Sequence, residues 1–148
     1  MDAEKRDELK CFFEPKSVAV IGASRNPLKF GYSLLQNLLE LKYEGKVYPV
    51  NPNADEVLGL RAYPRVDLID DDVELAIIIV PADKVPEIMK DCARKRVKGV
   101  VICSSGFRET GEVGQKLEAD VVATAKAAGI RVIGPNTTGI LNTANNFT

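Results

Sequence analysis

The chain has 148 residues, a formal net charge of −1 and no histidine. This length corresponds to one ordinary domain, and near-equal numbers of acidic and basic residues without a continuous basic face argue against a nucleic-acid partner. The lack of histidine removes the commonest general base and phosphoryl acceptor.

The first ten residues, MDAEKRDELK, are charged and lack the apolar segment of a signal peptide. No later apolar run approaches the roughly 20 residues that span a bilayer. We therefore expect no membrane partner and a cytoplasmic location. Cys11, Cys92 and Cys103 lack metal-ligand spacing, which favours reduced structural thiols over a disulfide framework or a zinc site.

The first predicted strand, residues 18–21, runs into a turn of small residues and then into a helix. Tyr32 and several leucines recur at helical spacing, so this helix opens just after Gly31. A second strand covers residues 46–50 and ends at the Asn-Pro turn signal that follows it. Residues 55–58 are predicted to form one helical turn.

The second half of the chain repeats this alternation. Residues 75–80, LAIIIV, are continuously apolar, as in a central strand covered on both faces, and Pro81 ends them. Helical periodicity over residues 85–92 is followed by a turn at Gly99 and a strand over residues 100–103.

One more helix and strand complete the pattern. Apolar positions 117, 121, 125 and 128 line a helix face, and Gly129 follows where a left-handed C-terminal residue is expected. Residues 131–133 form the fifth strand. Strands that alternate with helices pair in parallel through right-handed crossovers. We therefore predict an α/β fold, a doubly wound open parallel sheet of about five strands with a Rossmann-like arrangement.

We find no internal repeat or interdomain linker, so residues 1–148 are expected to form a single domain. Residues 134–148 continue past the last strand without the amphipathic helix that should cover it. We therefore expect this domain to be the N-terminal part of a longer chain.

Each predicted strand ends in a short loop of small or polar residues. Ligands of open α/β sheets bind at the carboxyl ends of the strands, which share one rim. The loops are residues 22–24, 51–53, 81–83, 104–107 and 134–139. Any one of them is weak evidence, but their convergence predicts a ligand site.

The first loop has the features of a phosphate site. Gly22 and Ala23 allow a ligand to approach the backbone closely, and Ser24 offers a hydroxyl. The following helix presents free amides and its positive end, and Arg25 and Lys29 add cations. The alternative is a tight turn with solvated cations.

A dinucleotide such as NAD is a possible ligand for this loop. However, Gly22, Ser24 and Gly31 do not reproduce the G-x-G-x-x-G spacing. The second strand also ends in Val50, Asn51 and Pro52, where NAD binding uses an acidic residue for the ribose. NAD is therefore disfavoured.

Six segments carry a family resemblance: FFEPKSVAVIGAS, NPLKFG, VNP, ELAIIIVPADKV, SSGFRETG and GPNTTGILNT. In this order, from about Leu9 to the end, they resemble the N-terminal CoA-binding domain of nucleoside-diphosphate-forming acyl-CoA synthetases. ADP-forming acetate-CoA ligase is the nearest form, and succinyl-CoA synthetase α subunits and ATP-citrate lyase are more distant. CoA is an anionic nucleotide, which suits the predicted phosphate loop.

The resemblance implies CoA or acyl-CoA as the ligand, and no catalytic or metal-binding residue in this chain. Residues 22–29 would hold the phosphates. The third loop would flank adenosine or pantetheine, the fourth would line the pantetheine path, and the fifth would lie near the thiol. The implied binding residues are Gly22, Ala23, Ser24, Arg25, Lys29, Asn51, Pro52, Val80, Pro81, Ala82, Cys103, Ser104, Ser105, Asn136 and Thr137. Two positions depart from the family pattern: Asn53 stands where a lysine is frequent, and Thr137 where cysteine is usual.

In that family, acyl-CoA and phosphate react through an acyl phosphate and a phosphohistidine that phosphorylates ADP. The histidine lies on a following domain, and an ATP-grasp domain or subunit handles the nucleotide. The resemblance therefore implies a CoA-binding domain that is not catalytic alone and whose partners are further ligase domains or an ATP-grasp subunit. The alternatives are a CoA-responsive regulatory module, as in protein acetyltransferases, and an NAD-binding domain.

Three local features have simpler interpretations. Residues 70–72 are consecutive aspartates that cannot all point at one metal ion, so a solvated loop is expected. Cys103 has no histidine to activate it, so a buried inert thiol is expected. Glu109 is interpreted as part of a helix start, although the resemblance would also let it approach a ligand.

Overall fold

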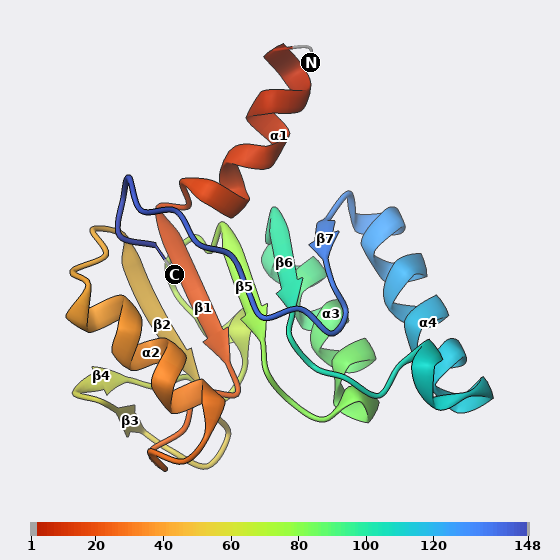
Figure 1. The fold of residues 1–148 in the computed structure, drawn as a ribbon, viewed down its shortest axis with the longest axis horizontal. Helices are drawn as coiled ribbons and strands as arrows, with labels where there is room; N and C mark the ends of the chain where they lie inside the picture. The colour runs from red at the N-terminus through yellow and green to blue at the C-terminus, as the bar shows by residue number, and fades with distance from the viewer. Residues whose placement is uncertain (1–2, 148) are drawn as a thin grey trace.

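The computed structural model describes residues 3–147, with side chains from Glu8 onward. Figure 1 shows a single main sheet between helices, with α2 in front of the sheet and α3 behind it. The sheet has five strands in the order β2-β1-β5-β6-β7, and every neighbouring pair is parallel. The predicted doubly wound α/β fold is confirmed. The strand order reverses between β1 and β5, which makes this pair the topological switch point.

The main-sheet strands are β1 Ser17–Ile21, β2 Lys46–Val50, β5 Leu75–Ile78, β6 Gly99–Ile102 and β7 Arg131–Ile133. The helices are α1 Ala3–Phe13, α2 Phe30–Glu40, α3 Val85–Lys95 and α4 Glu112–Ala128. Three short 3-10 turns, Val66–Leu68, Ala82–Lys84 and Arg108–Thr110, lie in the loops. A two-stranded hairpin, β3 Glu56–Val57 and β4 Leu60–Arg61, follows β2.

The two faces of the sheet form two apolar layers. Because successive strand residues point to opposite faces, Val18 and Val20 of β1 pack with the leucines of α2, while Ala19 and Ile21 pack with α3 and α4. Every residue of β1, β5 and β6 is buried. This burial on both faces explains why those strands read as continuous apolar runs.

Several predicted boundaries differ from the structure. The helical turn predicted for residues 55–58 is wrong, because Glu56 and Val57 form β3 of the hairpin, which turns at Gly59 with φ of 79°. The turn predicted at Gly99 is also wrong, because Gly99 begins β6. A Cβ on Gly99 would lie 2.8 Å from the Sγ of Cys11, so a glycine is needed there for close approach of α1. Gly129 has the predicted left-handed conformation.

Two terminal features were not predicted. Helix α1 precedes β1, and its Phe12 is buried in the layer that contains α2. The C-terminal tail, residues 134–147, runs back across the front of the sheet (Figure 1), and Phe147 is buried in the same layer. The side-chain amides of Asn142 and Asn145 donate to the carbonyl oxygen of Phe13 at 2.7 and 2.9 Å. The tail therefore covers part of the face that we expected to lack a covering element.

No helix within residues 3–147 is long and apolar enough to cross a membrane.

Candidate ligand-binding site

Hydrogen bonds connect the loops at the carboxyl ends of β1 and β2. The amide of Gly22 donates to the carbonyl oxygen of Val50 at 3.0 Å, and the side-chain amide of Asn51 donates to the carbonyl oxygen of Ala23 at 2.8 Å. The first and second predicted loops are therefore joined through backbone atoms, and Asn51 has a structural function at this junction.

The remaining loops are joined in the same way. The amide of Val80 donates to the hydroxyl of Ser104 at 3.2 Å, and the carbonyl oxygen of Ser104 accepts from the amide of Asn136 at 3.0 Å. The amide of Ile79 donates to the carbonyl oxygen of Ile21 at 2.8 Å, which links the two halves of the sheet. All five predicted loops thus meet at one edge, which we call the strand-end rim.

Gly22 and Gly31 allow the first loop to pack closely. Gly22 has φ of 98°, and a Cβ there would lie 2.2 Å from the carbonyl oxygen of Ile79. A Cβ on Gly31 would lie 2.1 Å from the carbonyl oxygen of Gly22. The space beside each glycine is therefore filled by protein backbone. We expected Gly22 to leave room for a ligand. The structure shows that protein packing alone is enough to require glycine at position 22, because the carbonyl oxygen of Ile79 occupies the space of a Cβ.

The N-terminus of α2 has the properties of an anion site. Its N-cap residue, Lys29, is extended and makes no side-chain capping bond. Within residues 3–147 the amides of Phe30 and Gly31 have no hydrogen-bond acceptor, so these donors and the positive end of the helix dipole are left without an anionic partner, although Gly31 itself is buried. The side chains of Arg25 and Lys29 are exposed and have no partner among the described residues. Amides, dipole and cations therefore favour an anionic ligand here.

The hairpin adds a cation that the sequence analysis missed. The amide of Tyr63 donates to the carbonyl oxygen of Pro49, and its carbonyl oxygen accepts from the amide of Asn51, both at 2.9 Å. The guanidinium of Arg61 lies 4.8 Å from the centre of the Tyr63 ring, in a cation–π contact. Arg61 is therefore held beside the end of β2. Its sequence signal was the alternation around Gly59, which indicates a short hairpin.

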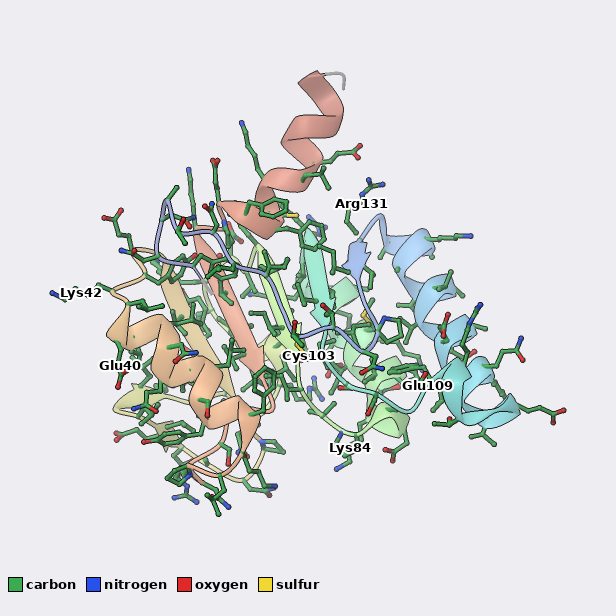
Figure 2. The ribbon with its side chains drawn as sticks, in the orientation of Figure 1. Glu40, Lys42, Lys84, Cys103, Glu109 and Arg131 are labelled. Carbon is green, nitrogen blue, oxygen red and sulfur yellow. The ribbon has the colours of Figure 1, made fainter. Side chains whose placement is uncertain are left out.

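The loop after β6 is ordered by its own carboxylate. Glu109 accepts a hydrogen bond from the amide of Gly106 at 2.6 Å. This bond, followed by those from other backbone amides of the loop, lowers the pKa of Glu109. Figure 2 shows Lys84 and Glu109 at the strand-end side of the sheet and Arg131 at the opposite end. Glu109 therefore supports the loop that carries the predicted residues Ser104 and Ser105.

Cys103 lies under the C-terminal tail and lines a small cavity of about 80 Å³ with Leu34, Thr138 and Ile140 among its walls. Burial raises the pKa of the Cys103 thiol. Thr137, which precedes Thr138 in the tail, accepts a hydrogen bond on its hydroxyl oxygen from the amide of Gly139 at 3.4 Å. Cys103 is thus half-buried between sheet and tail, while the exposed side chains of Pro52, Pro81 and Ser105 lie on the rim.

A larger groove of about 390 Å³ lies beside β7, and Phe107, Gly134 and Pro135 of the last two rim loops form one end of it. It runs between α1, α4 and β7 and is lined mainly by apolar side chains such as Phe12, Val121 and Ile133. None of the predicted binding residues lines it. We favour the first loop of the rim as the site of an anionic ligand, because there the exposed cations Arg25 and Lys29 lie beside helix-terminal amides without acceptors, whereas the groove is mainly apolar.

Comparison with known proteins gives a consistent result. The family model described as CoA binding domain matches residues 16–143. The chain is 55% identical over 140 residues to an ADP-forming acetate–CoA ligase II of Archaeoglobus fulgidus, covering 95% of this chain and 21% of that protein. It is 48% identical to the α subunit of an ADP-forming acetate–CoA ligase I of Pyrococcus furiosus, covering 91% of this chain and 30% of that subunit.

Solved structures show the same fold. A dinucleotide-forming acetyl-coenzyme A synthetase 1 from Candidatus Korarchaeum cryptofilum, in complex with phosphate and ADP, matches with a TM-score of 0.89 and 44% identity, covering 94% of this chain and 30% of that one. A crystal structure from Pyrococcus horikoshii matches with a TM-score of 0.90 and 49% identity, covering 95% of this chain and 32% of that one. This chain therefore spans about a fifth to a third of the length of these relatives.

Proposed function

This chain belongs to the CoA binding domain family, and from that premise we propose that its strand-end rim binds CoA or acyl-CoA. The observation that carries the proposal is that the family match, residues 16–143, contains all five loops of the rim. An extended molecule such as CoA, which combines a nucleotide with a long pantetheine arm, is long enough to contact several of these loops at once.

The first loop supports a position for the CoA diphosphate. The amides of Phe30 and Gly31, which have no acceptor among the described residues, the helix dipole and the cations of Arg25 and Lys29 all favour negative charge at one place. From there the pantetheine arm would pass Val80 and Ser104, whose hydrogen bond joins the next two loops, and would end near Cys103 and Thr137. The remaining predicted residues, Gly22, Ala23, Ser24, Asn51, Pro52, Pro81, Ala82, Ser105 and Asn136, complete this proposed path.

We further propose that the domain serves an ADP-forming acyl-CoA ligase. The relatives that support this are named as ADP-forming acetate–CoA ligases, and they are three to five times longer than the aligned region. This chain has no histidine, so phosphoryl transfer through a phosphohistidine would need further ligase domains or a partner subunit. We expect residues 1–148 to act as one CoA-binding domain that is not catalytic alone.

An NAD site has less support at the same rim. The residue that follows β2 is Asn51, whose side-chain amide is bonded to the carbonyl oxygen of Ala23. An NAD site of the usual kind places a carboxylate at that strand end to bind the ribose hydroxyls. The rim thus offers a site for the phosphate groups of a dinucleotide but no acidic partner for the ribose of its adenosine half.

Titration calorimetry with CoA, acetyl-CoA and NADH tests the proposed ligand. We expect saturable binding of CoA and acetyl-CoA that weakens as salt rises, because charge attraction supplies part of the affinity. NADH should bind much more weakly. Equal binding of NADH and CoA, or no binding of CoA at millimolar concentration, would contradict the proposal.

A further inference from the structure

We propose that Asn26 is a positioning residue, which holds the loop between β1 and α2 in the conformation that receives the ligand phosphates. This inference rests on the proposed function, because it concerns the same site. Asn26 is exposed, and it lies within the segment that the resemblance assigns to the CoA phosphates, without an individual role inferred for it from the sequence. It is not expected to contact CoA itself.

The geometry of Asn26 carries the inference. Its side-chain oxygen Oδ1 accepts a hydrogen bond from the amide of Leu28 at 3.0 Å, and its carbonyl oxygen accepts from the amide of Lys29 at 3.0 Å. Its own amide donates to the hydroxyl of Ser24 at 3.0 Å. One residue therefore makes three of the hydrogen bonds that shape this loop, two of them local side-chain turns of the kind typical of Asn and Ser.

Pro27 strengthens the same conformation. The proline ring fixes its own φ and restricts the preceding residue, Asn26, to extended backbone. An Asn-Pro pair with a side-chain bond across the turn leaves few alternative conformations for residues 26–29. The exposed loop is therefore rigid for local reasons, with little help from burial.

The conformation of this loop determines the geometry of the proposed anion site. Lys29 follows the turn directly, and its carbonyl oxygen accepts from the amides of Tyr32 at 3.0 Å and Ser33 at 3.3 Å. Those bonds fix where α2 starts and therefore where the free amides of Phe30 and Gly31 point. A ligand that meets a preformed loop does not have to order it on binding, so the loss of Asn26 should weaken affinity.

Three variants separate positioning from a structural effect. Asn26→Ala removes the Oδ1 acceptor. Asn26→Asp keeps that acceptor but adds a negative charge beside the proposed phosphate position. Gln115→Ala is the control, since Gln115 lies in α4, is exposed, carries a side-chain amide like that of Asn26 and makes no side-chain hydrogen bond among the described residues. CoA affinity, melting temperature and amide hydrogen exchange of Leu28 are measured for each, beside the parent chain.

We expect Asn26→Ala to bind CoA about fivefold to tenfold more weakly, as for the loss of one capping-type bond. The Leu28 amide should exchange faster, and the melting temperature should stay within a few degrees. Asn26→Asp should keep the Leu28 protection and show a CoA deficit that shrinks as salt rises, because its charge is screened. Gln115→Ala should match the parent in all three measurements.

If the parent binds CoA and Asn26→Ala binds it equally well, the positioning role is overturned while the proposed function stands. A loss of affinity that accompanies a large fall in melting temperature, with no recovery of Leu28 protection in Asn26→Asp, would also overturn it. If the parent itself fails to bind CoA, the proposed function fails first and the positioning role fails with it.

Discussion

A Cβ atom on Gly31 would lie 2.1 Å from the carbonyl oxygen of Gly22, which is too close for a carbon and an oxygen atom that are not bonded to each other. Gly31 is the second residue of α2, where alanine would otherwise be preferred by about 1 kcal/mol. The two effects have opposite signs, and the clash is with backbone that cannot rotate away.

We therefore expect Gly31→Ala to lower the free energy of unfolding by about 1–3 kcal/mol, as for an overpacked site. Urea denaturation followed by circular dichroism measures this change. Asn37→Ala in the same helix is the control and should be neutral or slightly stabilising. A Gly31→Ala protein as stable as the parent would show that α2 does not pack this closely on the first loop.

Lys29 tests the cationic part of the site. Lys29→Ala should weaken CoA binding and reduce its dependence on salt, because one positive charge near the diphosphate is lost. The melting temperature should change by only a few degrees, since an exposed cation without a partner contributes little to stability. Lys116→Ala, an exposed lysine of α4, is the control. Equal affinity of parent and Lys29→Ala at low salt would remove Lys29 from the site.

The thiols should differ in reactivity. Burial raises the pKa of Cys92 to about 12 and also raises the pKa of Cys103, so both are mostly protonated at pH 8. Cys103 is half-buried whereas Cys92 is fully buried, so iodoacetamide should modify Cys103 before Cys92. If CoA passes this position, it should slow the labelling of Cys103, as mass spectrometry of the labelled peptides would record. Labelling of Cys103 at the same rate with saturating CoA would exclude that path.

Because of Asp67, the free energy of unfolding should depend on pH in the acid range. Two hydrogen bonds from Arg65, at 2.7 and 2.9 Å, lower the pKa of Asp67 below its ordinary value of 3.8, and Arg94 adds to the effect. A carboxyl whose folded pKa is lowered stabilises the protein above its ordinary pKa, and that contribution is lost as pH falls through the folded value.

We expect Asp67→Asn to lower stability at pH 7 by about 1 kcal/mol. The difference from the parent should shrink below about pH 3.8, where the carboxyl of the parent becomes protonated. Chemical denaturation across this pH range measures it, with Asp72→Asn, an exposed aspartate without a partner among the described residues, as the control. A difference that stays constant with pH would mean that the charge of Asp67 does not matter.

The main sheet could be predicted from the sequence because its signals are strong and local. A strand was predicted over residues 75–80 because they are apolar at every position, as a strand buried on both faces requires, and β5 covers residues 75–78 of that run. Gly129 marked the end of α4 because it takes a left-handed conformation. The position of the strand-end rim could then be predicted, because the carboxyl ends of parallel strands lie at the same edge of the sheet.

Other features depend on contacts that a local pattern does not record. The hairpin at Glu56 and Arg61 is only two residues long in each strand, so its alternation is too brief to distinguish from a helical turn. Phe147 has no periodic neighbours, and its burial depends on the tail crossing the sheet to reach Tyr43, whose ring centre lies 5.4 Å away. Asn26 was overlooked because a side chain that shapes a loop has the same sequence signal as an ordinary turn residue.

The central claim is that the backbone amides without acceptors at the start of α2 hold the diphosphate of CoA. Titration of the isotope-labelled chain with CoA, followed by amide NMR shifts, tests it most directly. We expect the largest shifts at residues 22–31, with smaller shifts along the loops after β5, β6 and β7. Shifts confined to the groove between α1, α4 and β7, with residues 22–31 unchanged, would contradict the claim.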